Sequence, residues 1–328
     1  MSPENLAMGI LFLTQTGVGI SGNFLLLFYY SFFVFTGKSL TLKDLLIQHL
    51  TFANFWVITS RGIPQTMAEF GMKYFLGDTG CKLILYLYRV ARGISLYTTC
   101  CLSCFQAVTI SSSNRWRTLK QRATKYFGPS CSLSWLVHPL LNMLISMRTV
   151  GPRNNKNSSK TFNFGYCSGF VTDTMATAIY ALILCCTDGL CLGLMAWASG
   201  SMVSILYGHK RQVRYIHSAH RSPRVSPEPR ATQTILLLVC TFVTFYALSS
   251  ILLLHSAMFG NTNVWAMNVF TFIETRFPTL CPFVLISNSN SVSRLLSLLC
   301  EQVIFSEQCT SSSDVHSVMC WYIASFIR

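Results

Sequence analysis

The feature that most constrains this chain is a series of long apolar stretches without acidic or basic residues. Residues 5–37 contain no Asp, Glu, Lys or Arg, and residues 231–273 contain none either. A helix rises about 1.5 Å per residue, so about 20 apolar residues cross a hydrocarbon layer of about 30 Å. Comparable stretches recur along the chain until there are seven. The sequence therefore predicts an all-α membrane protein, a seven-transmembrane-helix bundle.

The predicted spans cover most of the chain. They are residues 8–35, 45–68, 83–112, 126–146, 174–207, 231–259 and 264–287. The last two are separated at residues 260–263, Gly-Asn-Thr-Asn, because four turn-forming residues in succession favour a tight loop. We expect a single bundle domain over residues 1–290, followed by a tail over residues 291–328.

The basic residues of the loops indicate how the bundle is oriented. The first, third and fifth predicted loops carry Lys38, Lys43, Arg115, Arg117, Lys120, Arg122, Lys125, Lys210, Arg211, Arg214, Arg221, Arg224 and Arg230. Loops rich in Lys and Arg face the cytoplasm, so the amino terminus is expected outside the cell and the tail inside. Much of the net charge of +14 thus lies beside membrane spans rather than in a separate basic domain, which argues against nucleic-acid binding.

The 14 cysteines are distributed unevenly over this topology. All but two fall within predicted spans or in the tail. Cys81 is at the outer end of the third span, and Cys167 is in the loop after the fourth span. Only these two are expected on the oxidising side of the membrane, where disulfides form. We predict a disulfide between them that holds this loop over the mouth of the bundle.

The same loop carries a glycosylation sequon, Asn157-Ser158-Ser159. Such sequons are acceptors in surface loops of proteins that enter the secretory route, which agrees with the predicted position of the loop. We predict that peptide-N-glycosidase speeds the migration of the expressed protein on a gel, and that Asn157→Gln abolishes this shift. Unchanged mobility of the wild-type protein would remove one support for the topology.

Ionisable side chains inside the predicted spans are costly, so each needs a partner or a function. The basic ones are Arg61, Arg89, Arg92 and Arg276, and the two acidic ones are Asp188 and Glu274. We consider Arg89, Arg92, Arg61, Glu274 and Asp188 candidate ligand-binding residues, because a small-molecule pocket between helices opens in the outer half of a bundle. The excess of arginine favours an anionic or acceptor-rich ligand. The alternative is that the arginines pair with Glu274 or Asp188 and serve the fold alone.

The sequence lacks the arrangements typical of a membrane enzyme. It has no H-E-x-x-H, P-loop or G-x-S-x-G motif, and its histidines form no metal-ligand pattern. The two span carboxylates lie in different spans. We therefore expect no catalytic residue, metal ion or cofactor. A transporter remains an alternative, although no repeated half is visible and seven spans do not divide into equal inverted units.

Several strings of residues in one order along the chain narrow the class further. They are residues 62–67 (Gly-Ile-Pro-Gln-Thr-Met), 74–76 (Tyr-Phe-Leu), 80–83 (Gly-Cys-Lys-Leu), 89–93 (Arg-Val-Ala-Arg-Gly), 188–195 (Asp-Gly-Leu-Cys-Leu-Gly-Leu-Met), 230–236 (Arg-Ala-Thr-Gln-Thr-Ile-Leu), 277–280 (Phe-Pro-Thr-Leu) and 282–285 (Pro-Phe-Val-Leu). Together they resemble the vomeronasal type-1 pheromone receptors of the G-protein-coupled receptor superfamily. This family also lacks the Asp-Arg-Tyr and Asn-Pro-x-x-Tyr motifs that are absent here. Cys281 and the sequence beyond residue 293 depart from the family pattern.

The resemblance implies a pheromone or chemosensory receptor in the plasma membrane. Such a receptor binds a small pheromone or odorant and activates a heterotrimeric G protein, which the family implies is of the inhibitory class. A bitter-taste-type receptor is an alternative, since it shares the missing motifs. Lys210, Arg211 and Arg214 continue the fifth predicted helix beyond the lipid, where they could contact the G protein or acidic lipid headgroups. Cys300 follows an apolar segment that resembles a palmitoylated one.

Overall fold

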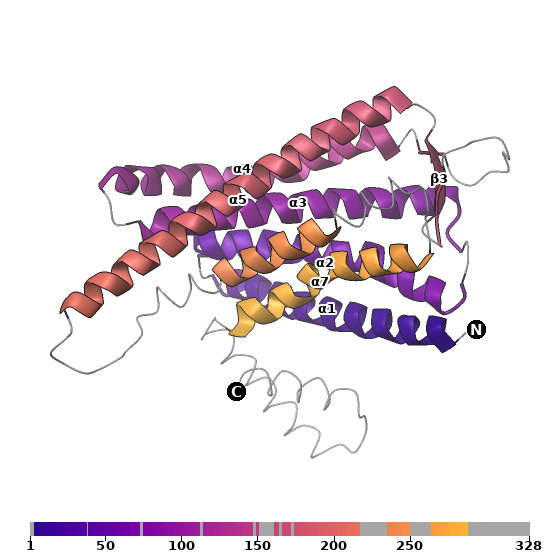
Figure 1. The fold of residues 1–328 in the computed structure, drawn as a ribbon, viewed down its shortest axis with the longest axis horizontal. Coiled ribbons are helices and arrows are strands. Elements are labelled where there is room, and N and C mark those ends of the chain that lie inside the picture. Colours follow the sequence, from indigo (N-terminus) through magenta and orange to yellow (C-terminus); the bar gives the residue numbers. More distant parts are fainter. Residues whose placement is uncertain are drawn as a thin grey trace, which may run out of the picture.

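The uncharged stretches of the sequence are helical in a computed structural model of the chain (Figure 1). The structure describes residues 3–37, 39–72, 75–111, 114–146, 149–150, 161–163, 166–171, 174–216, 235–249 and 264–287. Its helices are α1 (Pro3–Phe35), α2 (Leu42–Glu69), α3 (Asp78–Ile110), α4 (Asn114–Ser146), α5 (Thr174–Ile216), the helix Ile235–Ser249 and α7 (Val264–Ser287). The predicted seven-helix fold class is confirmed, whereas the turn at residues 260–263 and the tail lie outside the described residues.

Buried polar side chains lie inside the bundle beside an apolar core, and large apolar side chains cover its outside. By length and composition, four of the described helices can cross a membrane, namely α1, α3, α5 and α7. The helix α2 is less apolar because its inner face carries Asn54, Arg61 and Gln65, all of them buried. On the outside, large apolar side chains such as Leu136 and Leu190 are exposed. This pattern suits a bundle surrounded by lipid, whose interior holds the groups that lipid cannot solvate.

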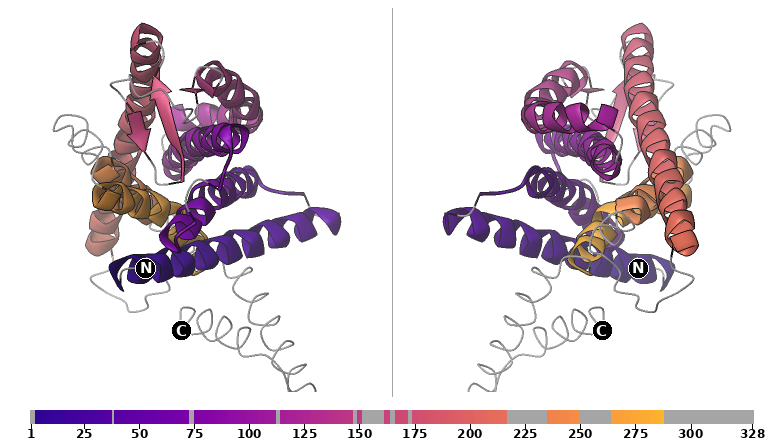
Figure 2. Two further views of the ribbon diagram at one scale, coloured as in Figure 1. Left: turned by 90° about the vertical axis from the view of Figure 1, so that its right-hand side faces the viewer. Right: turned by 90° about the vertical axis from the view of Figure 1, so that its left-hand side faces the viewer.

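The helices close into a ring with α3 in a central position. The helix α3 packs against α2, α4 and α5, while α7 packs against α1 and α2. Figure 2 shows the two orange helices, Ile235–Ser249 and α7, between α5 and α1, and they complete the ring. Polar groups on α3, α5 and α7 can therefore meet inside the bundle.

Local signals fix where α1 ends and α2 begins. Gly37 follows α1 with a φ of 76°, a left-handed conformation that glycine adopts without a Cβ penalty. Thr41 then caps α2: its Oγ1 accepts a hydrogen bond from the Asp44 backbone N–H, and Asp44 accepts one from the Thr41 N–H. This capping box satisfies backbone donors at the start of the helix.

A small antiparallel sheet lies at the end of the bundle that also holds the amino terminus (Figure 1). It comprises β1 (Thr149–Val150), β2 (Thr161–Asn163) and β3 (Ser168–Val171), in the order β1-β3-β2. Thr149 pairs with Val171, and Phe162 pairs with Gly169. Strands this short give no clear alternation in the sequence, so the sheet was not predicted. We call this end, which the sequence predicts to be extracellular, the outer end.

The close approach of α3 and α4 depends on Gly93. A Cβ atom on Gly93 would lie 2.4 Å from Nδ1 and 2.7 Å from Cε1 of the His138 ring. We predict that Gly93→Ala lowers the unfolding free energy by about 1–3 kcal/mol, because overpacking displaces the ring or parts the helices. The thermal unfolding midpoint of the purified protein is the measurement.

Gly189 in α5 provides a matched control, since a Cβ added there meets nothing within 4 Å. Gly189→Ala should leave the midpoint unchanged or raise it, because alanine favours a helix over glycine by about 1 kcal/mol. The double variant Gly93→Ala, His138→Ala should regain part of the loss. Equal midpoints for Gly93→Ala and Gly189→Ala would contradict the close contact.

Candidate functional site

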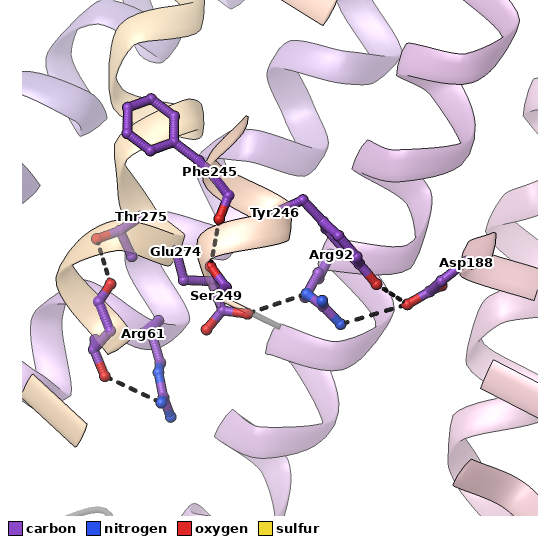
Figure 3. Close-up of polar contacts among 9 residues, drawn as sticks. Arg61, Arg92, Asp188, Phe245, Tyr246, Ser249, Glu274 and Thr275 are labelled. Carbon is purple, nitrogen blue, oxygen red and sulfur yellow. Dashed lines mark hydrogen bonds and ion pairs between the residues drawn. The ribbon is translucent and has the colours of Figure 1, made fainter. Parts of the chain in front are cut away.

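Arg92 of α3 lies between two acidic side chains from other helices (Figure 3). Its Nε is 3.1 Å from Oε1 of Glu274 in α7, and its Nη1 is 3.9 Å from Oδ2 of Asp188 in α5. The Tyr246 hydroxyl, from the helix Ile235–Ser249, donates a hydrogen bond to the same oxygen of Asp188. The Arg92 guanidinium also lies 4.8 Å from the centre of the Tyr246 ring. One guanidinium thus connects four helices.

The burial of this cluster makes its pairing important for the fold. The Glu274 side chain is 7% exposed and the Asp188 side chain 19%, whereas Arg92 is 33% exposed. A carboxylate in such a place is stable as long as a cation compensates it. The alternative that the arginines pair with Glu274 or Asp188 therefore applies to Arg92, which lies against both of these acids at once.

A small cavity adjoins the cluster. Its volume is about 40 Å³, and Arg92, Glu274 and Tyr246 line one side of it. Aromatic rings of Phe242, Phe245 and Phe277, together with Ser249, form much of the remaining wall. Pockets for small molecules measure about 300–1,000 Å³, whereas this space holds only a few waters. The space is therefore too small for such a molecule, and a ligand must move side chains or helices to fit into it.

Arg61 of α2 lies in a separate, more deeply buried position. Its side chain is 1% exposed, and it donates hydrogen bonds from Nη1 to the Tyr166 hydroxyl at 3.0 Å and from Nη2 to Thr271 Oγ1 at 3.1 Å. The Tyr88 and Phe270 rings flank the guanidinium, with centroids 5.2 Å and 6.0 Å away. Hydroxyls and ring faces thus surround this charge.

The other two span arginines do not join the cluster. Arg89 is partly buried and does not line the cavity. Three residues turn a helix by about 300°, so the side chains of Arg89 and Arg92 diverge by about 60°. Arg276 is partly exposed and lies over the Phe272 ring of its own helix, at 3.9 Å from the centroid. Of the five candidate ligand-binding residues, the structure groups Arg92, Glu274 and Asp188 and places Arg61 nearby.

The interior contains a third acid that sequence reasoning missed. Glu69 is 8% exposed and accepts a hydrogen bond from Gln65 Nε2, which also donates to Asn268 Oδ1 in α7. The predicted span ended one residue earlier, but α2 continues to Glu69. The count of two acids inside the bundle was therefore wrong, and the cationic excess is smaller than predicted.

A disulfide joins Cys81 of α3 to Cys167, with the two Cα atoms 5.8 Å apart. Tyr166 and Cys167 are both 1% exposed and pack with Cys81 against Ala68 and Leu76. The bond therefore fixes the segment before β3 against the outer ends of α2 and α3. It also determines where Tyr166 enters the bundle.

Several predicted positions lie outside this description. Asn157, Cys300 and the tail over residues 291–328 are not among the described residues.

Lys210, Arg211 and Arg214 lie in the last turns of α5, which Figure 1 shows extending past the neighbouring helices at the end opposite the sheet. The described residues contain no group of three or more His, Cys, Asp or Glu side chains that could hold a metal.

The functional residues that sequence reasoning missed are mainly tyrosines. Tyr88, Tyr166 and Tyr246 contact the arginines, but a search for charged residues inside spans does not select them. The position of Tyr166, directly before Cys167 of the predicted disulfide, was the one available signal. It placed this side chain at the mouth of the bundle.

Comparison with known proteins agrees with these features along nearly the whole chain. Residues 6–298 match the family described as the vomeronasal organ pheromone receptor family. Human vomeronasal type-1 receptor 4 is 45% identical over 295 residues, covering 90% of this chain and 98% of that protein. Human vomeronasal type-1 receptor 3 is 44% identical, and the match covers 92% of this chain and 96% of that protein. Olfactory receptor class A-like protein 1 of Danio rerio is 30% identical, and the match covers 93% of this chain and 96% of that protein.

The fold has a counterpart among solved structures. The crystal structure of squid rhodopsin superimposes with a TM-score of 0.68 at 14% sequence identity, covering 100% of this chain and 93% of that chain. Identity this low shows the shared fold alone. The family match and the human relatives establish more: the chain is a multi-pass membrane protein that belongs to the vomeronasal type-1 pheromone receptor family of G-protein-coupled receptors.

Proposed function

We propose that this receptor binds a small pheromone or odorant in the outer half of the bundle and activates a heterotrimeric G protein at the plasma membrane. The observation that carries the proposal is the cluster of Arg92, Glu274, Asp188 and Tyr246, which joins four helices beside a cavity. A ligand that enters there contacts side chains of α2, α3, the helix Ile235–Ser249 and α7. These residues and Arg61 form the proposed ligand site.

Signalling then follows from a shift in population. A ligand changes the balance of two conformations only by binding one of them better than the other. The small cavity of about 40 Å³ represents the state that a ligand of odorant size binds poorly. Opening it requires α7 or the helix Ile235–Ser249 to move relative to α3, and such a movement is the kind that exposes a surface for a G protein.

The inner end of α5 supplies the proposed contact with the G protein. Helix α5 continues to Ile216 and includes Lys210, Arg211 and Arg214. We infer an inhibitory-class G protein from the family resemblance. Replacing the three basic residues with glutamine should lower G-protein activation and leave ligand binding unchanged. If the basic residues bind acidic lipid instead, the same variant should lose affinity for vesicles that contain phosphatidylserine.

The ligand site is tested by filling the cavity. Ser249 lines the cavity and is 3% exposed, whereas Thr244 on the same helix is exposed. In cells that carry a promiscuous G protein, odorants, sulfated steroids and bitter compounds are screened for a response. Ser249→Leu should then weaken potency roughly tenfold or more, because overpacking costs about 1–3 kcal/mol. Thr244→Leu is the matched control and should keep wild-type potency.

Two outcomes contradict the proposal. Unchanged potency of Ser249→Leu at normal surface level would place the ligand elsewhere. Ligand-dependent flux across the membrane without a G protein would instead indicate a transporter.

A further inference from the structure

Tyr166 inserts its side chain into the bundle from the segment between β2 and β3. It is 1% exposed, and its hydroxyl accepts a hydrogen bond from Nη1 of Arg61 at 3.0 Å. Arg61 also donates to Thr271, and the Tyr88 ring lies beside its guanidinium. The guanidinium of Arg61 thus lies among side chains of α3 and α7 and one phenol that belongs to none of the helices.

This position lies directly above the cavity on each of the three helices. Arg61 is one turn outward from Val57 on α2, and Tyr88 is one turn outward from Arg92 on α3. Thr271 is one turn outward from Glu274 on α7. Val57, Arg92 and Glu274 all line the cavity. A helical turn rises about 5.4 Å, so the Tyr166 site and the cavity form two successive layers of the bundle.

Besides a movement of the helices, a side chain that can leave is a second source of space in these two layers. The cavity of about 40 Å³ is smaller than an odorant needs. The helices around it are held by the Arg92 ion pairs, whereas Tyr166 belongs to a connecting segment fixed by a disulfide and short strands. Connecting segments open at lower free energy than packed helices. Withdrawal of Tyr166 would join its space to the cavity below.

We propose that Tyr166 occupies the head-group subsite of the ligand, where an acceptor oxygen of the ligand replaces the phenol as the hydrogen-bond partner of Arg61. This inference rests on the proposed function and assigns one subsite within it. The apolar body of the ligand extends down into the layer of Phe242, Phe245 and Phe277. Tyr166 therefore acts as a tethered competitor of the ligand.

The charges nearby define the chemical class of the head group. Figure 3 shows Glu274 between Arg61 and Arg92, and Asp188 lies on the far side of Arg92. The two positive and two negative charges of these residues sum to zero. An anion would leave the site with an uncompensated charge at low dielectric, whereas a neutral oxygen would not. The ligand class is a neutral molecule with a hydroxyl or carbonyl oxygen on an apolar, ring-containing body.

The test removes the phenol and supplies it again in solution. Para-cresol reproduces the tyrosine side chain, and toluene has the same ring without the oxygen. In purified Tyr166→Ala receptor in lipid nanodiscs, para-cresol should bind roughly tenfold or more tightly than toluene, because only the phenol accepts the hydrogen bond from a charged donor. Para-cresol should also raise the thermal unfolding midpoint of this variant and leave that of the wild-type receptor unchanged.

Two further variants separate this subsite from general binding of apolar molecules. In the double variant Tyr166→Ala, Arg61→Met, the preference for para-cresol over toluene should disappear. The control Tyr86→Ala removes a partly buried tyrosine of α3 that bonds to the Pro139 carbonyl. This variant should show no preference for para-cresol over toluene that depends on Arg61. If Tyr166→Ala fails to reach the cell surface, para-cresol in the medium should restore its surface level and toluene should not.

The outcomes distinguish this inference from the proposed function. Equal binding of para-cresol and toluene to Tyr166→Ala, or failure of para-cresol to restore the surface level, overturns the subsite even if odorants activate a G protein. Phenol binding that depends on Arg61, without any odorant response, supports the subsite and counts against the proposed function. A wild-type receptor that responds to carboxylic acids and not to the matching alcohols contradicts the neutral head group.

Discussion

Arg92→Met is expected to remove most of the receptor from the cell surface. Methionine keeps an unbranched apolar stem but leaves Glu274, which is 7% exposed, without its cation. Loss of one partner from a buried ion pair costs about 3–5 kcal/mol, a large part of the stability of an ordinary protein. Surface labelling of the variant in cells, with thermal unfolding of any purified protein, measures the effect.

The companion variants show whether the loss comes from the stranded acids. Adding Glu274→Gln and Asp188→Asn to Arg92→Met should restore part of the surface level, because no uncompensated carboxylate remains. Arg89→Met on the same helix is the control and should have a small effect, since Arg89 has no ion pair within the described residues. A normal surface level for Arg92→Met, with no change on removing the acids, would contradict the role of the cluster.

Cys81→Ser is expected to lower the unfolding free energy by about 2–5 kcal/mol, because the disulfide closes a long loop. The two cysteines are 86 residues apart in the sequence. Their bond also holds Tyr166 and Cys167 against the outer ends of α2 and α3. Surface level and the thermal midpoint of Cys81→Ser should therefore both fall sharply.

We expect the two cysteines to contribute to stability as one unit. Cys167→Ser should lose as much stability as Cys81→Ser, and the double variant should lose no more than either single one. Cys185 is a free, exposed cysteine of α5, so Cys185→Ser serves as the control. Thiol labelling of both Cys81 and Cys167 in receptor at the cell surface would refute the bond.

Charge-free stretches and loop charges made the helices predictable from the sequence. Local signals sufficed because a membrane span needs a continuous apolar run, whatever its neighbours are. The structure places a helix in each predicted region, although α4 begins at Asn114 rather than at residue 126. That difference arises because a helix continues into the aqueous loop, where the apolar signal ends.

The candidate site was less predictable because it depends on how the helices are rotated against one another. The sequence identified Arg92, Glu274 and Asp188, but not that one arginine would engage both acids. That requires α5 and α7 to face α3 at the same depth, and the periodicity within each helix does not determine their relative rotation. The neutral partners Tyr166 and Tyr246 became visible only through their contacts.

Nucleotide exchange with purified components tests the central proposal most directly. The receptor is placed in lipid nanodiscs with an inhibitory-class G protein, and binding of a GTP analogue is followed with and without an odorant that is active in cells. We expect the odorant to accelerate exchange for the wild-type receptor and for Thr244→Leu, and Ser249→Leu to need roughly tenfold more odorant. An exchange rate that is the same with and without odorant, for receptor that binds the odorant, would contradict it.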